Sequence, residues 1–326
     1  MASSRCGLRS DASTIPVGQA LLEYLASRGL AAPDCPLEVE PLGGGVSSDI
    51  VAVSGPGVAL VVKRALPRLK VERDWPADAR RIVVEARALR FAHGLTPDAV
   101  PSVLDLDEEE SVAALSLAPA GWVNWRDELL AGRVDVAVGS RLGELLAVWH
   151  DAEVPPELAD PEFFVQLRID PFHRVVASSH PELATRVAAV AERLLERKLA
   201  LVHGDFSPKN VLVGGDGLWV LDWEVAHQGD PAFDVAFLLT HLLLKSIHRR
   251  EGAAAYRAVA EAFLAAYGRD VEQLSENVGC LLLARVDGKS PAAYLRPRER
   301  ESVRALGSSL LREPAAGILD AWERLP

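Results

Sequence analysis

Hydrophobic positions change their spacing about one third of the way along the chain. In the first third, short apolar runs bounded by turn residues predict strands, and the sequence Ser-Gly-Pro-Gly at residues 54–57 separates two of them as a hairpin turn. Apolar residues three and four positions apart predict helices at residues 17–30 and 77–95. The predicted strands cover residues 37–42, 50–53, 58–62, 103–106 and 112–117.

Beyond residues 118–121, where Ala-Pro-Ala-Gly interrupts the pattern, the spacing is mainly helical, except for short strands within residues 201–224. We therefore expect an α+β protein of two lobes. Residues 1–117 would form a small β-rich N-lobe with an antiparallel sheet, and residues 118–326 a larger, mainly helical C-lobe. Residues 1–15, rich in Ser and Arg, are expected to be disordered. The predicted helices of the larger lobe cover residues 134–151, 181–197, 233–245, 253–267 and 271–284.

Polar side chains interrupt the apolar runs at one place in the larger lobe. Residues 201–213 read LVHGDFSPKNVLV and residues 220–224 read VLDWE, a pattern that predicts a small hairpin with Asp205, Asn210 and Asp222 at one end. Phosphoryl transfer uses such a set, because one carboxylate orients the acceptor hydroxyl while an Asn and a second Asp hold magnesium. The spacing from Asp205 to Asn210 matches the kinase catalytic loop. The alternative is an ordinary hairpin, since Asp and Asn are common in turns.

These residues carry a family resemblance. His-Gly-Asp at residues 203–205, with Asn210 and with Asp-Trp-Glu at residues 222–224, resembles the aminoglycoside phosphotransferase and choline kinase-like family. The members are small-molecule kinases with the protein-kinase-like fold, so the resemblance implies a bilobal fold. It also implies that Asp205 is the catalytic base, or the group that orients the acceptor hydroxyl, and that Asn210 and Asp222 ligate magnesium.

Neighbouring residues are expected to support this loop. His203 is interpreted as a structural anchor, Asp234 as a brace from the following helix, and Asp230 as a cap at the start of that helix. Lys209 would either reach the transferring phosphoryl group or face solvent. The interval at residues 222–233 is too short for the activation segment of a protein kinase, which favours a small acceptor over a polypeptide.

A glycine-rich loop at residues 42–49 lies between two predicted strands. Glycines there would let backbone N–H groups approach phosphates closely, and two serine hydroxyls would add donors. Similar small-molecule kinases carry a Gly-Gly-x-Ser type of loop at this point, so the resemblance implies nucleotide binding, whereas a plain turn is the alternative. The expected nucleotide-binding residues of the loop are Gly43, Gly44, Gly45, Ser47 and Ser48.

Lys63 ends a predicted strand, and Glu85 lies on the helix that follows. In the kinase pattern such a Lys contacts the nucleotide phosphates and pairs with a Glu on the next helix. The order of these elements therefore predicts a Lys63–Glu85 pair. The alternatives are that both side chains face solvent, as most charged side chains do, or that Arg64 takes the role of the lysine.

The composition excludes some other functions. The 326 residues include 35 Lys and Arg against 46 Asp and Glu, a net charge of −11 that argues against nonspecific nucleic-acid binding. Three widely spaced cysteines provide no disulfide framework and favour a reducing compartment, so we expect the cytoplasm. Residues 1–12 lack the apolar core of a secretory signal, and the apolar run at residues 236–244 is too short to cross a bilayer, so no membrane partner is expected.

Taken together, these features predict an ATP- and Mg²⁺-dependent phosphotransferase that acts on a hydroxyl of a small molecule. GTP could replace ATP, and the acceptor could be aminoglycoside-like, an amino alcohol, a sugar or a metabolite; the oligomeric state stays open. A catalytically silent nucleotide-binding or scaffold protein and a protein kinase are the alternatives. The region expected to line the acceptor site mixes aromatic and charged residues, although each could instead be core or surface: Trp122, Trp125, Phe163, Phe164, Arg168, Asp170 and Phe172.

Overall fold

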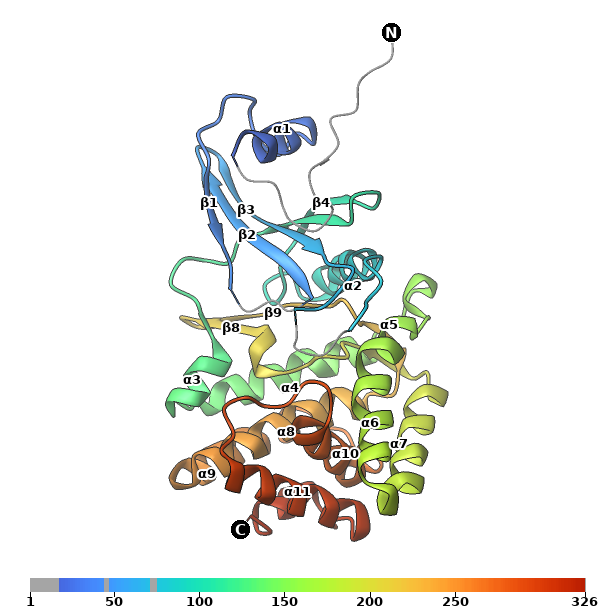
Figure 1. Cartoon of the computed structure of the whole chain (residues 1–326). Coiled ribbons are helices and arrows are strands. Elements are labelled where there is room, and N and C mark those ends of the chain that lie inside the picture. Colours follow the sequence, from blue (N-terminus) through green and yellow to red (C-terminus); the bar gives the residue numbers. More distant parts are fainter. Residues whose placement is uncertain (1–17, 44–46, 71–74, 326) are drawn as a thin grey trace. The chain divides into compact units, whose positions relative to one another are not determined.

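The computed structural model describes residues 18–43, 47–70 and 75–325, so the N-terminal segment expected to be disordered lies outside the described residues. Contacts between residues divide the chain into two compact units, Met1–Ala120 and Gly121–Pro326 (Figure 1). The first unit is built on a five-stranded sheet and the second is mainly helical. The predicted α+β fold class is therefore confirmed.

The sheet of the first unit is antiparallel throughout, with the strand order β1-β2-β3-β5-β4. All five strands were predicted, although β2 and β3 extend further than the apolar runs that indicated them. Helix α1 (Gln19–Ser27) packs its apolar face into a core with the sheet, and α2 (Arg81–Leu95) begins later than predicted. The strands are β1 (Glu38–Pro41), β2 (Ser48–Gly55), β3 (Val58–Ala65), β4 (Val103–Asp107) and β5 (Val112–Ser116).

Helices make up most of the second unit. All five predicted helices are present, whereas the helical residues 162–179 and helix α11 were not predicted. Helices α4 and α9 approach closely because Gly139 and Gly143 have no side chain: a Cβ there would come within 2.5 Å of Val259 O and within 2.4 Å of Phe263 O. The helices are α3 (Trp125–Ala131), α4 (Val136–Asp151), α5 (Glu162–Phe164), α6 (Val175–Ser179), α7 (Ala184–Glu196), α8 (Ala232–His248), α9 (Ala253–Tyr267), α10 (Leu274–Asp287) and α11 (Pro297–Arg312).

Helix α8 lies at the centre of this unit, in contact with α9, α10 and α11 (Figure 1). Every residue from Ala232 to Ile247 is buried, as its almost continuous apolar sequence requires. The helix predicted at residues 233–245 is present, but it continues one turn beyond its predicted end at Lys245. None of the helices in the described part of the chain is long and apolar enough to cross a membrane.

The strands around residues 201–224 match the predicted hairpin only in part. Strand β7 (Ala200–Val202) pairs with β10 (His227–Gly229), whereas β8 (Val211–Gly214) pairs with β9 (Gly217–Val220) and with β6 (Val123–Asn124). The polar residues therefore lie on loops that connect two separate small sheets. The predicted hairpin forms between β8 and β9, with Asn210 and Asp222 next to its open end. The pairing of β7 with β10 was not predicted, because strand partners far apart in sequence leave no local signal.

Candidate active site

The loop that follows β7 turns sharply at Gly204. Its φ of 75° lies in the left-handed region, and a Cβ there would meet Val225 Cγ2 at 2.8 Å and Val225 O at 2.9 Å. Only glycine fits this backbone conformation and this space without strain. The turn sends the next residue, Asp205, back into the protein, where it is 2% exposed.

Two side chains hold the backbone of this loop. The carboxylate of Asp234 accepts hydrogen bonds from the backbone N–H of His203 at 2.6 Å and of Gly204 at 2.8 Å, so its predicted bracing role is confirmed. His203 Nδ1 accepts from the N–H of Asp205 at 3.1 Å, and Nε2 lies 3.0 Å from the carbonyl oxygen of Leu221. Burial lowers the pKa of His203, which keeps the ring neutral. These contacts confirm that His203 anchors the loop.

Two cations meet the carboxylate of Asp205. Arg168 approaches Oδ2 to 2.9 Å, and Lys209 Nζ lies 2.7 Å from the same oxygen. Burial alone would raise the pKa of Asp205, but the Arg168 guanidinium and the Lys209 ammonium hold it below its usual value. Asp205 is therefore ionised, and it is better suited to accept a hydrogen bond from a hydroxyl than to act as a strong base.

Asn210 and Asp222 lie close to this carboxylate. Asn210 donates from Nδ2 to the carbonyl oxygen of Asp205 at 3.0 Å, which leaves its amide oxygen to face a cation. Lys209 Nζ lies 3.9 Å from Asp222 Oδ2, so one ammonium group reaches both carboxylates. Asp222 has a φ of 68°, a strained conformation that is typical of functional sites. The structure thus brings together all three residues predicted for the catalytic half.

The donor chemistry suits magnesium, which prefers oxygen ligands and usually keeps several waters or phosphate oxygens. Within the described ranges, no three His, Cys, Asp or Glu side chains lie close enough together to hold a metal ion. The chain itself would provide two oxygen ligands for the ion, one from the carboxylate of Asp222 and one from the amide of Asn210. A magnesium ion there would complete its coordination with phosphate oxygens and water.

In the first unit, β3 and α2 bring Lys63 and Glu85 together. Lys63 Nζ lies 2.7 Å from Glu85 Oε1, and the two side chains are only 5% and 2% exposed. The predicted pair forms, and the solvent-facing alternative is wrong. Arg64 instead approaches Glu110 at 3.3 Å. A buried ion pair gains little stability over apolar residues of similar size, so folding stability alone does not account for the pair.

The glycine-rich loop is described only at its edges. Gly43, Ser47 and Ser48 are placed, whereas Gly44 and Gly45 lie outside the described residues. Ser47 and Ser48 are buried, and Ser48 begins β2.

Arg81, which sequence analysis missed, fixes the base of this loop. Its fully buried guanidinium donates to the carbonyl oxygen of Ser47, to that of Leu66 at 2.9 Å and to that of Asp78 at 2.8 Å. In the sequence, Arg81 is only a charged residue near the start of a predicted helix, and nothing there indicates that its side chain is buried.

Arg168 was expected from the sequence only as a candidate for the acceptor site, and the structure places it against Asp205. It lies on the π-helical segment Val165–Arg174 and also donates to the carbonyl oxygen of Gly204 at 2.7 Å. It is buried, so the surface interpretation is wrong for it, whereas Asp170 pairs with Arg174 near the surface. The aromatic residues of this region that are buried in the core are Trp125, Phe163, Phe164 and Phe172.

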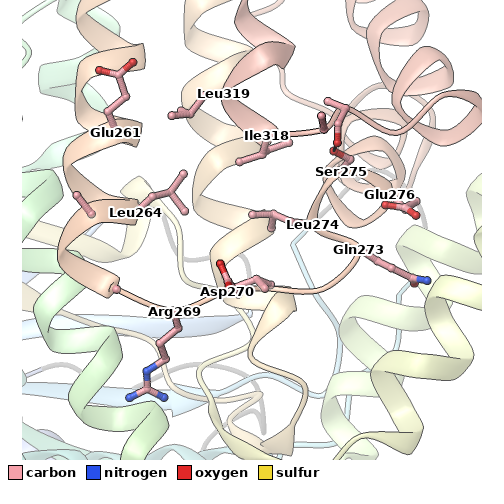
Figure 2. Close-up of a pocket in the computed structure, with 16 residues that line it drawn as sticks. Glu261, Leu264, Arg269, Asp270, Gln273, Leu274, Ser275, Glu276, Ile318 and Leu319 are labelled. Atoms are coloured by element: carbon pink, nitrogen blue, oxygen red, sulfur yellow. Dashed lines mark hydrogen bonds between the residues drawn. The ribbon is translucent and has the colours of Figure 1, made fainter.

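Two cavities are lined by described residues other than Lys63, Asp205, Asn210 and Asp222. The larger, of about 760 Å³, is lined by the end of α9, the start of α10 and residues 315–319 (Figure 2). The smaller, of about 380 Å³, is lined by residues between Gly121 and Arg141 and by residues 213–215. Trp125, which was expected to line the acceptor site, lines the smaller cavity. Figure 2 shows charged and apolar side chains around the larger cavity without a convergent set of ligating groups.

A small antiparallel sheet with a buried Lys–Glu pair, and a helical unit with an Asp–Asn–Asp loop, are the two parts of the protein-kinase-like fold. Residues 38–276 match the model of the phosphotransferase enzyme family, and the chain belongs to this family.

Known proteins agree with this assignment. A methylthioribose kinase of Bacillus cereus (strain AH820) is 27% identical over 229 residues, which are 59% of this chain and 57% of that protein. The chain thus spans little more than half the length of the curated relatives that it matches. Among solved structures, a choline/ethanolamine kinase family protein from Mesorhizobium loti is 18% identical with a TM-score of 0.53, over 93% of this chain and 92% of that one. A spectinomycin phosphotransferase in complex with ADP and spectinomycin is 14% identical with a TM-score of 0.51, over 95% and 94%. These structures establish the fold.

Proposed function

We propose that this protein transfers the γ-phosphoryl group of ATP, in a magnesium-dependent reaction, to a hydroxyl of a small molecule. The observation that carries the proposal is the ionised, buried Asp205, held by Arg168 and Lys209 beside Asn210 and Asp222. Membership of the phosphotransferase family supports it, and so does the similarity to a methylthioribose kinase and to a spectinomycin phosphotransferase.

In this proposal the N-terminal lobe, residues 1–117, binds the nucleotide. Lys63, oriented by Glu85, would contact its phosphates, and the loop residues Gly43, Gly44, Gly45, Ser47 and Ser48 would provide backbone and hydroxyl donors. The residues do not distinguish ATP from GTP.

The larger lobe, residues 118–326, would supply the catalytic half. Asn210 and Asp222 would hold magnesium, which when bound neutralises charge on the phosphates. The low pKa of Asp205 favours a role in aligning the acceptor hydroxyl and in receiving its proton late in the transfer. Lys209, within reach of both carboxylates, would meet the phosphoryl group as it transfers.

A small acceptor fits the short connection between Asp222 and helix α8. Residues 223–231 include β10 and leave no long segment that could bind a polypeptide substrate. The protein-kinase alternative is therefore disfavoured. We also propose the cytoplasm as the compartment, because Cys35 and Cys280 are free thiols in the described part of the chain.

The test is a screen of hydroxyl compounds that follows ADP release. Asp205→Asn keeps the size of the side chain but removes its charge, and should lower turnover on the order of 10²-fold or more while nucleotide affinity is kept. Asp216→Asn, an exposed aspartate in the β8–β9 turn, is the matched control and should be fully active. Equal turnover in Asp205→Asn and the native protein would contradict the proposed role. Nucleotide binding without turnover of any compound would favour a silent scaffold.

A further inference from the structure

A group of basic side chains lies inside the second unit, on α8 and α10. We call His241, Lys245 and Arg285 the basic cluster. Lys245 is fully buried and His241 is 7% exposed. The Nζ of Lys245 lies 3.5 Å from the carbonyl oxygen of His241 and 5.8 Å from the centre of the Tyr294 ring. Arg285 donates to Ser290 Oγ at 3.0 Å, so the loop after α10 covers the cluster.

No carboxylate of the described residues is in direct contact with the cations of the basic cluster. Among the described residues, neither Lys245 nor Arg285 has a carboxylate within 4.0 Å. Two other buried cations differ, since Lys63 is paired with Glu85 at 2.7 Å and Arg168 with Asp205 at 2.9 Å. An uncompensated buried charge is strongly destabilising, so its presence calls for an explanation.

Several polar atoms at the cluster are buried without a hydrogen-bond partner in the described residues: Arg285 Nε, His241 Nε2 and Tyr294 Oη. Each such atom destabilises the folded protein when it stays unsatisfied, and native proteins leave few of them. Arg285 Nε is a donor, and a tyrosine hydroxyl and one tautomer of histidine can donate as well. Buried donors without an acceptor, on the residues around a buried Lys245, are the groups that an anion would satisfy.

The basic cluster lies on the Asp205 side of the unit. The backbone N–H of Lys289, in the loop after α10, donates to the carbonyl oxygen of Pro171 at 3.1 Å, on the π-helical segment that carries Arg168. The charge of Asp205 reaches Arg285 strongly enough to affect the pKa of that residue. A small molecule whose hydroxyl meets Asp205 would therefore extend toward the basic cluster.

We propose that the basic cluster binds an anionic group of the acceptor, a carboxylate or a phosphate ester, while the acceptor hydroxyl faces Asp205. This inference rests on the proposed phosphotransferase function and narrows its substrate class. A polycationic acceptor would be repelled by Lys245 and Arg285, so the chain is expected to prefer a hydroxy acid or a sugar phosphate over an aminoglycoside.

The experiment compares matched acceptors by ADP release: hydroxy acids against their amides, and sugar phosphates against the free sugars. The two pairs separate a carboxylate from a phosphate as the recognised group. Arg285→Gln should raise the KM for the preferred anionic acceptor at least 10-fold, and Arg285→Lys should recover part of the loss. The control is Arg250→Gln, which removes an exposed arginine outside the cluster and should leave KM unchanged.

The outcomes separate this inference from the proposed function. Turnover that favours the amides, the free sugars or cationic acceptors, with KM unchanged in Arg285→Gln, overturns the inference and leaves the phosphotransferase function intact. If no acceptor is turned over, the anion site is tested directly. Binding of inorganic phosphate and of acetate to the ADP-saturated protein is then measured by thermal shift and calorimetry. Weaker binding in Arg285→Gln supports the anion site, and equal binding in both proteins overturns it.

Discussion

Replacing the buried Lys245 by methionine should stabilise the protein, by an amount that shrinks as the pH rises. Burial, followed by the neighbouring charges of Arg285 and Arg126, lowers the pKa of Lys245 from 10.5 to about 7. Between these values the unfolded chain binds the proton and the folded chain does not, so the free energy of unfolding rises with pH across this window. Below pH 7 both states are protonated and the full penalty of burying the charge is present.

The magnitude follows from the same two values. At about 1.4 kcal/mol for each pH unit, the fall from 10.5 to about 7 corresponds to about 5 kcal/mol at low pH. About 4 kcal/mol of this penalty remains at pH 7, and about 1 kcal/mol at pH 10. Methionine is unbranched and apolar and favours helices, so it can fill the space of the lysine stem without leaving a charge.

The assay is denaturant unfolding of the native protein and of Lys245→Met, followed by circular dichroism, at pH 7 and pH 10. The control is Lys198→Met, which changes an exposed lysine and should have the same small effect at both pH values. A variant that is less stable than the native protein at pH 7 would refute the reasoning. An equal gain at the two pH values would also refute it, because the gain would then come from packing rather than from charge.

Two further predictions concern the loop around Asp205. Gly204→Ala should destabilise the protein by about 1–3 kcal/mol and reduce turnover, because the new Cβ would clash with Val225 in a left-handed backbone conformation; unfolding curves and kinetics would measure both effects. Arg168→Met should raise the pKa of Asp205, since burial would then oppose ionisation with one cation fewer, and the acid limb of the pH–rate profile should move to higher pH. An unmoved acid limb would mean that Arg168 does not set the charge of Asp205.

Local sequence patterns were enough to predict much of the fold and part of the candidate active site. The strands of the first unit were visible because apolar runs and turn residues are local signals. The Lys63–Glu85 pair followed from the order of a strand and the next helix. The Asp234 brace was recognisable for the same reason, since it opens the helix that follows the catalytic loop.

Arg168 and Lys245 could not be predicted in the same way. Arg168 reaches Asp205 from a π-helical segment, in which the usual spacing of three and four residues does not show which side chains point inward. Lys245 was expected at the end of a helix, where a lysine normally faces solvent. It is buried because α8 continues beyond it and because Tyr294, in a loop distant in sequence, lies over its ammonium group.

The two buried lysines differ in what sets their charge. Lys63 has a carboxylate partner at 2.7 Å, so its positive charge is compensated within the chain. Lys245 has no such partner among the described residues, and with a pKa of about 7 its charge depends on what lies beside it. An anion bound at the basic cluster would raise this pKa and draw a proton onto Lys245. The anion should therefore stabilise the native protein more than it stabilises Lys245→Met. The difference in free energy of unfolding that favours Lys245→Met at pH 7 should then shrink as the anion concentration rises. If the gain is the same with and without saturating anion, Lys245 takes no part in binding it.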